Sequence, residues 1–341
     1  MERRTRVIAH RGASGLRPEH GADAYRLAVE AGADAIEPDI VATKDGVLVL
    51  RHENEISGTT DVAEHPAFAD RRTTKEIDGE SVTGWFTEDF TWAELSQVRI
   101  RERLPELRPE SAAHDGEGRI QRLGDLLDLL DGDAARTAAA EGTAPVGLVA
   151  EIKHATYFAS IGLPLDELVA AELASRGWAD DPRLTVESFE ATVLGRLRER
   201  GVGGRHVYLL EKKGAPFDLV ARDGSSAETY AAQLEPESLD GLAASGLSGI
   251  SVPKKLLLNK DGSGDARLVD RAHAAGLEIL TWTLRPENLF LAKAWRSGSD
   301  PAALGDWRQE FSRIVDTGVD GVFTDFPGML GELLRDRVAV D

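Results

Sequence analysis

The chain has 341 residues, a formal net charge of −19 and no cysteine. The lack of cysteine excludes disulfides, thiolate metal sites and cysteine nucleophiles. The negative charge argues against nucleic acid or an anionic membrane surface as a partner, and no apolar run is long enough for stable membrane insertion.

The chain begins with a polar, charged segment, Met1–Arg6, which leads directly into the first apolar run. We therefore expect no signal peptide and a cytoplasmic location for the sequence as it stands. If a leader has been removed, the location would be periplasmic or secreted.

Short runs rich in Val, Ile and Leu recur along the chain, as in buried parallel strands. The predicted strands are Val7–Ala9, Ala35–Val41, Val47–Arg51, Val146–Ile152, Leu184–Phe189, His206–Leu210, Gly249–Val252, Ile279–Thr283 and Gly321–Thr324. Apolar residues at helical spacing predict helices at Ala22–Ala31, Leu165–Arg176, Ala191–Arg200, Pro236–Ala244 and Ala266–Ala275. This alternation predicts an α/β fold, a (β/α)8 TIM barrel, with residues 1–341 as one domain.

Nine predicted strands are one more than a barrel needs, and the surplus is expected around Lys44-Asp45-Gly46-Val47, where Asp-Gly favours a hairpin. A two-residue turn there would place Asp39 opposite His52. Glu37 would share that face, because side chains alternate along a strand. A slip of one residue would undo this arrangement.

Three segments interrupt the alternation. Residues 53–118 are polar and irregular, and we expect an insertion that forms a small subdomain and covers the active site. Its aromatic residues include Trp85, Phe86, Phe90 and Trp92. Ala215–Thr229 is predicted to be a surface loop, and Leu284–Arg313 a smaller insertion or helical decoration.

Chemically active side chains stand at the ends of the predicted strands. Glu37, Asp39 and Glu151 are carboxylates at strand positions, where burial is costly unless they are paired or bound to metal. Three hard oxygen donors favour one divalent cation, Ca²⁺ or Mg²⁺, over Zn²⁺.

His10 and His52 end two different strands, and such a pair can serve as general acid and general base at neutral pH. Arg11 and Lys153 supply the local positive charge that a bound phosphodiester requires. The other six histidines have no comparable setting and are predicted to be structural or exposed; they are His20, His65, His114, His154, His206 and His273.

Taken together, these segments resemble the glycerophosphodiester phosphodiesterase family, in particular its periplasmic-type members with an insertion after the second catalytic histidine. The matching segments are His10-Arg11-Gly12, Arg17-Pro18-Glu19, Glu37-Pro38-Asp39, Thr43-Lys44-Asp45-Gly46, His52, Glu151-Ile152-Lys153, Ser188-Phe189, Thr281-Trp282-Thr283 and 318–327. They extend from Val7 to about Leu334, which is nearly the whole chain.

The resemblance implies a TIM-barrel phosphoric diester hydrolase that converts glycerophosphodiesters to sn-glycerol 3-phosphate and an alcohol. It implies His10 and His52 as the acid–base pair and Arg11 and Lys153 at the phosphate. It also implies Glu37, Asp39 and Glu151 as metal ligands, and Trp282 beside the glycerol or in an apolar wall, with Phe189 as a further candidate. Attack by a glycerol hydroxyl and direct attack by water both stay open, as does which histidine is the acid.

The chain departs from the family pattern at three places. Pro18-Glu19-His20-Gly21 replaces Pro-Glu-Asn-Thr, which is expected to alter a helix cap while Glu19 contacts Arg11 or the substrate. Glu53 replaces Asp. Glu187 replaces Gln and adds a carboxylate that could bind the metal or raise the pKa of a neighbouring acid.

Two other functions fit the same sequence. A lysophospholipase D-like phosphodiesterase would need an apolar rim, which the aromatic residues of the insertion could form. A non-catalytic glycerophosphodiester-binding protein is disfavoured, because a binder gains nothing from two acid–base groups. The sequence does not predict an oligomeric state.

Overall fold

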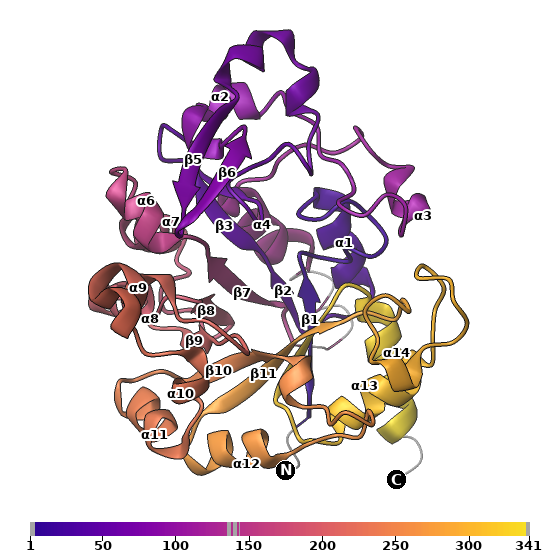
Figure 1. The fold of residues 1–341 in the computed structure, drawn as a ribbon. Helices are drawn as coiled ribbons and strands as arrows, with labels where there is room; N and C mark the ends of the chain where they lie inside the picture. The colour runs from indigo at the N-terminus through magenta and orange to yellow at the C-terminus, as the bar shows by residue number, and fades with distance from the viewer. Residues whose placement is uncertain (1–3, 135–137, 139–141, 143, 339–341) are drawn as a thin grey trace.

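The computed structural model describes residues 4–134, 138, 142 and 144–338, and its centre is a closed barrel of eight parallel strands (Figure 1). Seven barrel positions are single strands, while β2 and β3 share the eighth and are separated by Pro38, which has no N–H to donate. The barrel strands are β1 (Arg6–His10), β2 (Ala35–Glu37), β3 (Asp39–Ala42), β7 (Gly147–Ile152), β8 (Leu184–Ser188), β9 (Arg205–Leu209), β10 (Gly249–Pro253), β11 (Glu278–Leu284) and β12 (Gly321–Thr324). Parallel pairing of β1 with both β2 and β12 closes the ring, which confirms the predicted TIM barrel.

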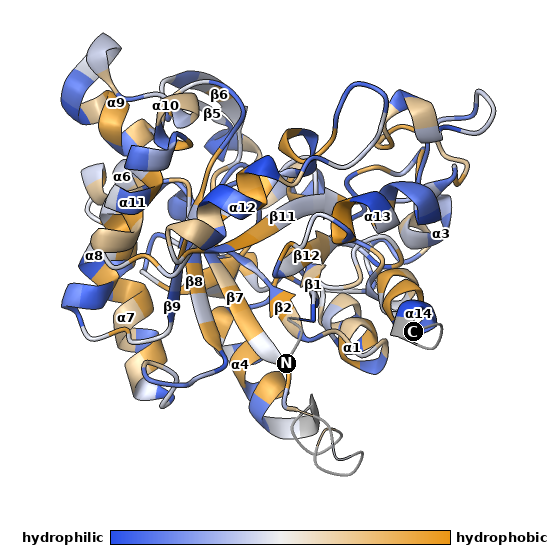
Figure 2. Ribbon diagram, turned by 90° about the horizontal axis from the view of Figure 1, so that it is seen from below, coloured by the Kyte–Doolittle hydropathy of each residue, from blue (hydrophilic) through white to orange (hydrophobic). Residues whose placement is uncertain are grey.

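Helices surround the strands, as the view from below shows (Figure 2). All five predicted helices are present, and Gly32, Gly177, Gly201 and Gly276 follow four of them with φ between 73° and 85°. The helices are α1 (Ala22–Glu30), α2 (Trp92–Leu95), α3 (Pro109–Ala112), α4 (Leu123–Leu129), α6 (Ala155–Ser160), α7 (Leu165–Ser175), α8 (Ala191–Glu199), α9 (Phe217–Asp223), α10 (Tyr230–Gln233), α11 (Pro236–Ala244), α12 (Arg267–Ala274), α13 (Trp307–Val315) and α14 (Pro327–Val338). None of the helices described is both long and apolar enough to cross a membrane.

The barrel strands are buried on both faces, which is why they read as continuous apolar runs. All six residues of β7 are buried. Inside the barrel a small cluster comprises Ile8, Ala35, Val149, Val207, Leu280 and Phe323, while a much larger apolar cluster fills the space between strands and helices. The polar strand ends therefore sit on a rigid support.

The hairpin that adds β4 (Leu48–Leu50) to the barrel confirms the surplus strand but not its predicted register. Ile40 pairs with Leu50, so Arg51 rather than His52 lies opposite Asp39, and the predicted two-residue turn is wrong by one residue. The cause is Gly46, whose φ of 76° makes it the third residue of the loop. His52 thus lies just beyond the end of the ladder.

Residues 53–118 contain a second small sheet, the hairpin of β5 (Thr73–Ile77) and β6 (Glu80–Gly84), together with α2, α3 and short 3-10 turns. The hairpin lies at the end of the molecule opposite the two termini (Figure 1). Phe86 and Phe90 are fully buried, and the Phe90 ring meets Phe68 edge-on at 5.1 Å between centroids. These aromatic side chains belong to the same large apolar cluster that packs between the barrel strands and helices, so this segment is packed onto the barrel.

The two later irregular segments also contain helix. The predicted loop Ala215–Thr229 is wrong, because α9 occupies Phe217–Asp223 and a 3-10 turn follows at Gly224–Ser226. A single apolar stripe over seven residues is too short to stand out as a periodic signal. Leu284–Arg313 contains a 3-10 turn at Lys293–Trp295 and the start of α13, which confirms the predicted helical decoration.

Candidate active site

A cavity of about 380 Å³ opens where the carboxyl ends of the barrel strands meet. Because parallel strands point the same way, residues that end different strands gather at one rim. Nine of the eleven predicted site residues line it: His10, Arg11, Glu37, His52, Glu151, Lys153, Glu187, Phe189 and Trp282. The other two, Glu19 and Asp39, are buried.

Three buried carboxylates form the floor of the site. Glu37, Asp39 and Glu151 each offer an oxygen, and these atoms lie within 4.8 Å of one another. Glu37 Oε1 and Asp39 Oδ1 are buried without a hydrogen-bond partner. Unsatisfied carboxylate oxygens facing one another are costly, and a cation would relieve that cost.

The pKa values of these carboxylates are shifted in opposite directions. Burial and the neighbouring Asp39 raise the pKa of Glu37 well above its ordinary range, and burial raises the pKa of Glu151 to about 7. Burial also acts on Asp39, but Arg11 and other cations hold its pKa well below the ordinary range. Glu187 lies beside them with one buried oxygen unpaired, and burial and Glu151 raise its pKa as well.

Two cationic side chains, Arg11 and Lys153, form ion pairs with these carboxylates. Arg11 has φ 61° and is followed by Gly12 at φ 85°, so the chain turns immediately after β1. The Arg11 guanidinium lies 3.1 Å from both Glu19 and Asp39. Lys153 Nζ donates to Glu151 at 2.7 Å, and Glu151 and Asp39 raise the pKa of this ammonium despite its burial.

His10 is held by Asp325, a residue of the 318–327 segment that is not among the predicted site residues. Asp325, directly after β12, lies 2.6 Å from His10 Nδ1 and also accepts hydrogen bonds from Arg108 and Arg285. Although burial opposes it, these two arginines hold the pKa of Asp325 well below its ordinary range. As an ionised carboxylate can only accept, Nδ1 of His10 must donate, leaving Nε2 as the free base.

His52 has a similar partner in Glu53, whose carboxylate contacts Nδ1. Arg103, from the 53–118 segment, donates to Glu53 at 2.7 Å and to Glu19 at 2.6 Å. Burial and then Arg11 lower the pKa of His10 to about 4 and that of His52 to about 3. Both rings are therefore neutral at pH 7 in the free protein.

His20, predicted to be structural or exposed, is fully buried and touches the carboxylate cluster. Its Nε2 lies 3.0 Å from Asp39 Oδ2, and its Nδ1 lies 2.9 Å from the hydroxyl of Tyr25. The next residue, Gly21, is the N-cap of α1 and provides no side-chain cap, as the departure from Asn-Thr suggested. His20 thus supports Asp39 from behind.

The aromatic wall is formed by Phe189 and Trp282, whose rings meet edge-on at 5.9 Å between centroids. The four insertion residues considered for an apolar rim, Trp85, Phe86, Phe90 and Trp92, do not belong to it. Phe86 and Phe90 are buried in the large apolar cluster shared with the barrel, and neither Trp85 nor Trp92 lines the cavity.

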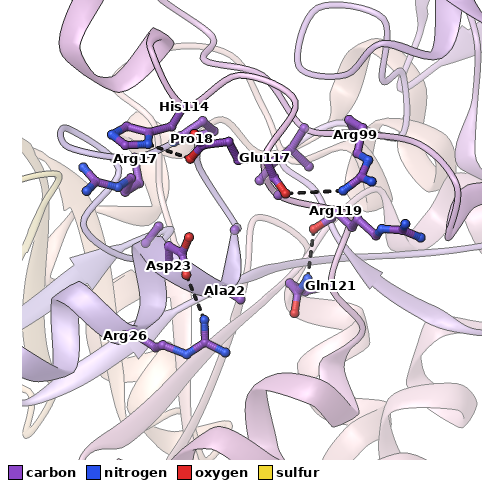
Figure 3. A pocket seen from close by; sticks show the side chains of 14 residues that line it. Arg17, Pro18, Ala22, Asp23, Arg26, Arg99, His114, Glu117, Arg119 and Gln121 are labelled. Atoms are coloured by element: carbon purple, nitrogen blue, oxygen red, sulfur yellow. Dashed lines mark hydrogen bonds and ion pairs between the residues drawn. The ribbon is translucent and has the colours of Figure 1, made fainter.

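A separate pocket of about 300 Å³ lies between the loop after β1, α1 and the insertion (Figure 3). Its charged groups are largely engaged: Arg26 donates to Asp23 at 2.8 Å, and Arg99 and Arg119 donate to backbone carbonyls. None of the eleven predicted site residues lines this pocket.

A barrel whose strand ends bring together clustered carboxylates, two histidines and two cations belongs to the class of TIM-barrel enzymes that act on phosphate esters. Residues 10–329 match the model of the Glycerophosphoryl diester phosphodiesterase family. The chain therefore belongs to this family and is a phosphodiesterase.

Individual relatives agree. The chain is 31% identical over 345 residues to glycerophosphodiester phosphodiesterase GDPD6 of Arabidopsis thaliana, a match that covers 95% of this chain and 84% of the relative. It is 40% identical over 331 residues to the glycerophosphodiester phosphodiesterase of Bacillus subtilis, covering 96% and 86%. A solved Oleispira antarctica phosphodiesterase in complex with the product sn-glycerol-3-phosphate has the same fold, with a TM-score of 0.62, 18% identity and coverage of 97% and 96%.

Proposed function

We propose that this protein hydrolyses glycerophosphodiesters to sn-glycerol 3-phosphate and an alcohol, with one divalent cation and His10 and His52 as the acid–base pair. The observation that carries the proposal is a single cavity that holds both histidines and two of the three clustered carboxylates, with Asp39 buried behind them. The names of the relatives supply the substrate class.

Glu37, Asp39 and Glu151 would hold the cation. Their oxygens fit a hard ion, because they are all buried, lie close together and include two atoms that accept no hydrogen bond. When bound, Ca²⁺ or Mg²⁺ would neutralise negative charge on a phosphate oxygen as it develops in the transition state. Arg11 and Lys153 would hold the remaining charge of the phosphate.

Each histidine is oriented for proton transfer by a carboxylate on Nδ1. Asp325 does this for His10 and Glu53 for His52, so Nε2 is the nitrogen that takes or gives the proton. A bound phosphodiester would pair with Arg11 and Lys153, the two cations that, after burial, lower the pKa of His52 most. Substrate binding would therefore raise the proton affinity of His52 and suits it to protonate the leaving alcohol.

The direct test is release of sn-glycerol 3-phosphate from glycerophosphocholine by the purified protein. We expect turnover with added Ca²⁺ or Mg²⁺, none with excess chelator, and recovery when the cation is restored. Absence of product from both glycerophosphocholine and glycerophosphoethanolamine with either cation would contradict the proposal.

The lysophospholipase D-like alternative loses its main support, because the insertion's aromatic side chains do not line the cavity. We expect faster turnover of glycerophosphocholine than of lysophosphatidylcholine. A higher kcat/KM for the acylated compound would favour the alternative.

A further inference from the structure

A second cavity adjoins the active site on the side away from the carboxylate cluster. It has a volume of about 570 Å³ and shares Glu211, Trp282, Thr283 and Arg285 with the active-site cavity. A substrate whose phosphodiester lies at the carboxylate cluster can therefore extend past Trp282 into this space.

The wall of the second cavity is strongly basic. Three successive barrel strands deliver cations to it: Lys212 and Lys213 follow β9, Lys254 and Lys255 follow β10, and Arg285 follows β11. Arg296 is the sixth cation, and Glu211 is the only carboxylate in the lining. This local excess of positive charge contrasts with the chain as a whole, whose net charge is −19.

Two of the six cations already have acidic partners. Lys254 is buried and lies 2.5 Å from Glu310, and Arg285 donates to Asp325 at 2.5 Å. Both are part of the supporting structure and bring little uncompensated charge to the cavity.

The others remain available to a ligand. Lys212, Lys213 and Lys255 are exposed, and within the described part of the chain their ammonium groups form no ion pair or hydrogen bond. Among the described residues, Arg296 donates only to the backbone carbonyls of Leu289 and Leu291. Three free ammonium groups around one hollow make a positive field that a multiply charged anion would satisfy best.

We propose that this cavity, which we call the basic subsite, binds a phosphate group carried by the substrate beyond its reacting phosphodiester. The preferred substrates would then be glycerophosphodiesters whose alcohol bears an additional phosphate. This inference rests on the proposed function, because it assumes that the diester reacts at the carboxylate cluster.

The test compares two substrates that differ by one phosphate, glycerophosphoinositol and glycerophosphoinositol 4-phosphate. We expect the wild-type protein to have a kcat/KM about ten-fold higher for the phosphorylated compound, a preference that falls as ionic strength rises. The variant Lys212→Gln/Lys213→Gln/Lys255→Gln should lose most of that preference and keep its rate on glycerophosphoinositol.

A charge-matched control is Arg26→Gln/Lys44→Gln/Arg119→Gln, which removes three positive charges at positions lining neither cavity. It should keep the preference. Equal rates on the two substrates with the wild-type protein, or an unchanged preference in the lysine variant, would overturn the inference.

Binding measurements separate this inference from the proposed function. If no diester is hydrolysed, the proposed function fails, yet calorimetry can still show whether the wild-type protein binds the phosphorylated compound more tightly than the lysine variant does. If the wild-type protein hydrolyses the two substrates at equal rates, while inorganic phosphate changes turnover of glycerophosphoinositol in the wild-type protein but not in the lysine variant, the subsite serves a free anion and the substrate assignment is wrong.

Discussion

Replacing Asp325 with asparagine would remove the charge that organises one side of the active site. The carboxylate accepts from His10 Nδ1 at 2.6 Å, from Arg108 at 2.7 Å and from Arg285 at 2.5 Å. Removing one partner from a buried ion pair costs about 3–5 kcal/mol. Because Arg108 keeps its bond to Glu287 and Arg285 is partly exposed, we expect the free energy of unfolding to fall by about 3 kcal/mol.

The effect of Asp325→Asn on catalysis should be larger than its effect on stability. Without the carboxylate, the ring of His10 loses the group that fixes its orientation and stabilises its protonated form, so kcat should fall by about 10²- to 10⁴-fold. The carboxylate also raises the pKa of His10 against the effect of burial. The acidic limb of the pH profile of kcat/KM should therefore move to lower pH, which loss of structure alone would not cause.

The assay is release of sn-glycerol 3-phosphate by Asp325→Asn across a pH series, with folding checked by denaturant titration. Asp316→Asn, which makes the same change at an exposed surface pair with Arg337, should alter neither rate nor stability appreciably. A folded Asp325→Asn protein whose kcat stayed within about three-fold of wild type would refute the role given to this carboxylate.

Three further predictions concern the metal, the insertion and pH. Glu37→Gln should stabilise the metal-free protein by about 1 kcal/mol at neutral pH, because it removes the cost of burying an ionisable carboxyl group beside Asp39. It should also abolish the thermal stabilisation by added Ca²⁺ or Mg²⁺, and a retained metal response in differential scanning fluorimetry would contradict this. Arg103→Met removes the cation that holds Glu53 against His52, so kcat should fall about ten-fold with little change in KM. A kcat equal to that of the wild-type protein would argue against a positioning role for Arg103. Burial lowers the pKa of His10 to about 4 and that of His52 to about 3, against an ordinary value of 6.5. Between these values the unfolded chain binds protons that the folded protein does not, so the free energy of unfolding should fall as the pH drops from 6.5 towards 4. A free energy of unfolding by urea that stayed constant over this range would refute the prediction.

Much of the barrel could be predicted because its signals are local. Short apolar strands, amphipathic helices and the glycines that end helices recur in order along the sequence. Each of these signals can be recognised from neighbouring residues alone. The register of the β3–β4 hairpin could not be predicted, since Asp45-Gly46 fits both a two-residue turn and a three-residue loop. The conformation of Gly46 decided between them.

Some residues of the site could likewise be predicted from the sequence, and others could not. His10, Glu37 and Glu151 could be grouped from sequence because each ends a parallel strand, and such ends converge. Asp325 also follows a predicted strand, and its place beside His10 could be predicted from the pairing of the first and last strands in a closed barrel. Arg103 and Arg108 could not be placed, because an irregular insertion gives no local indication of where its side chains reach.

The most direct test of the account is the rate of sn-glycerol 3-phosphate release from glycerophosphocholine by His10→Ala and by His52→Ala, at saturating Ca²⁺ or Mg²⁺. Each variant should lose at least about 10²-fold in kcat, while His114→Ala, which lies outside the cavity, should match the wild-type protein. Near-normal turnover by either variant would show that the acid–base pair has been wrongly assigned.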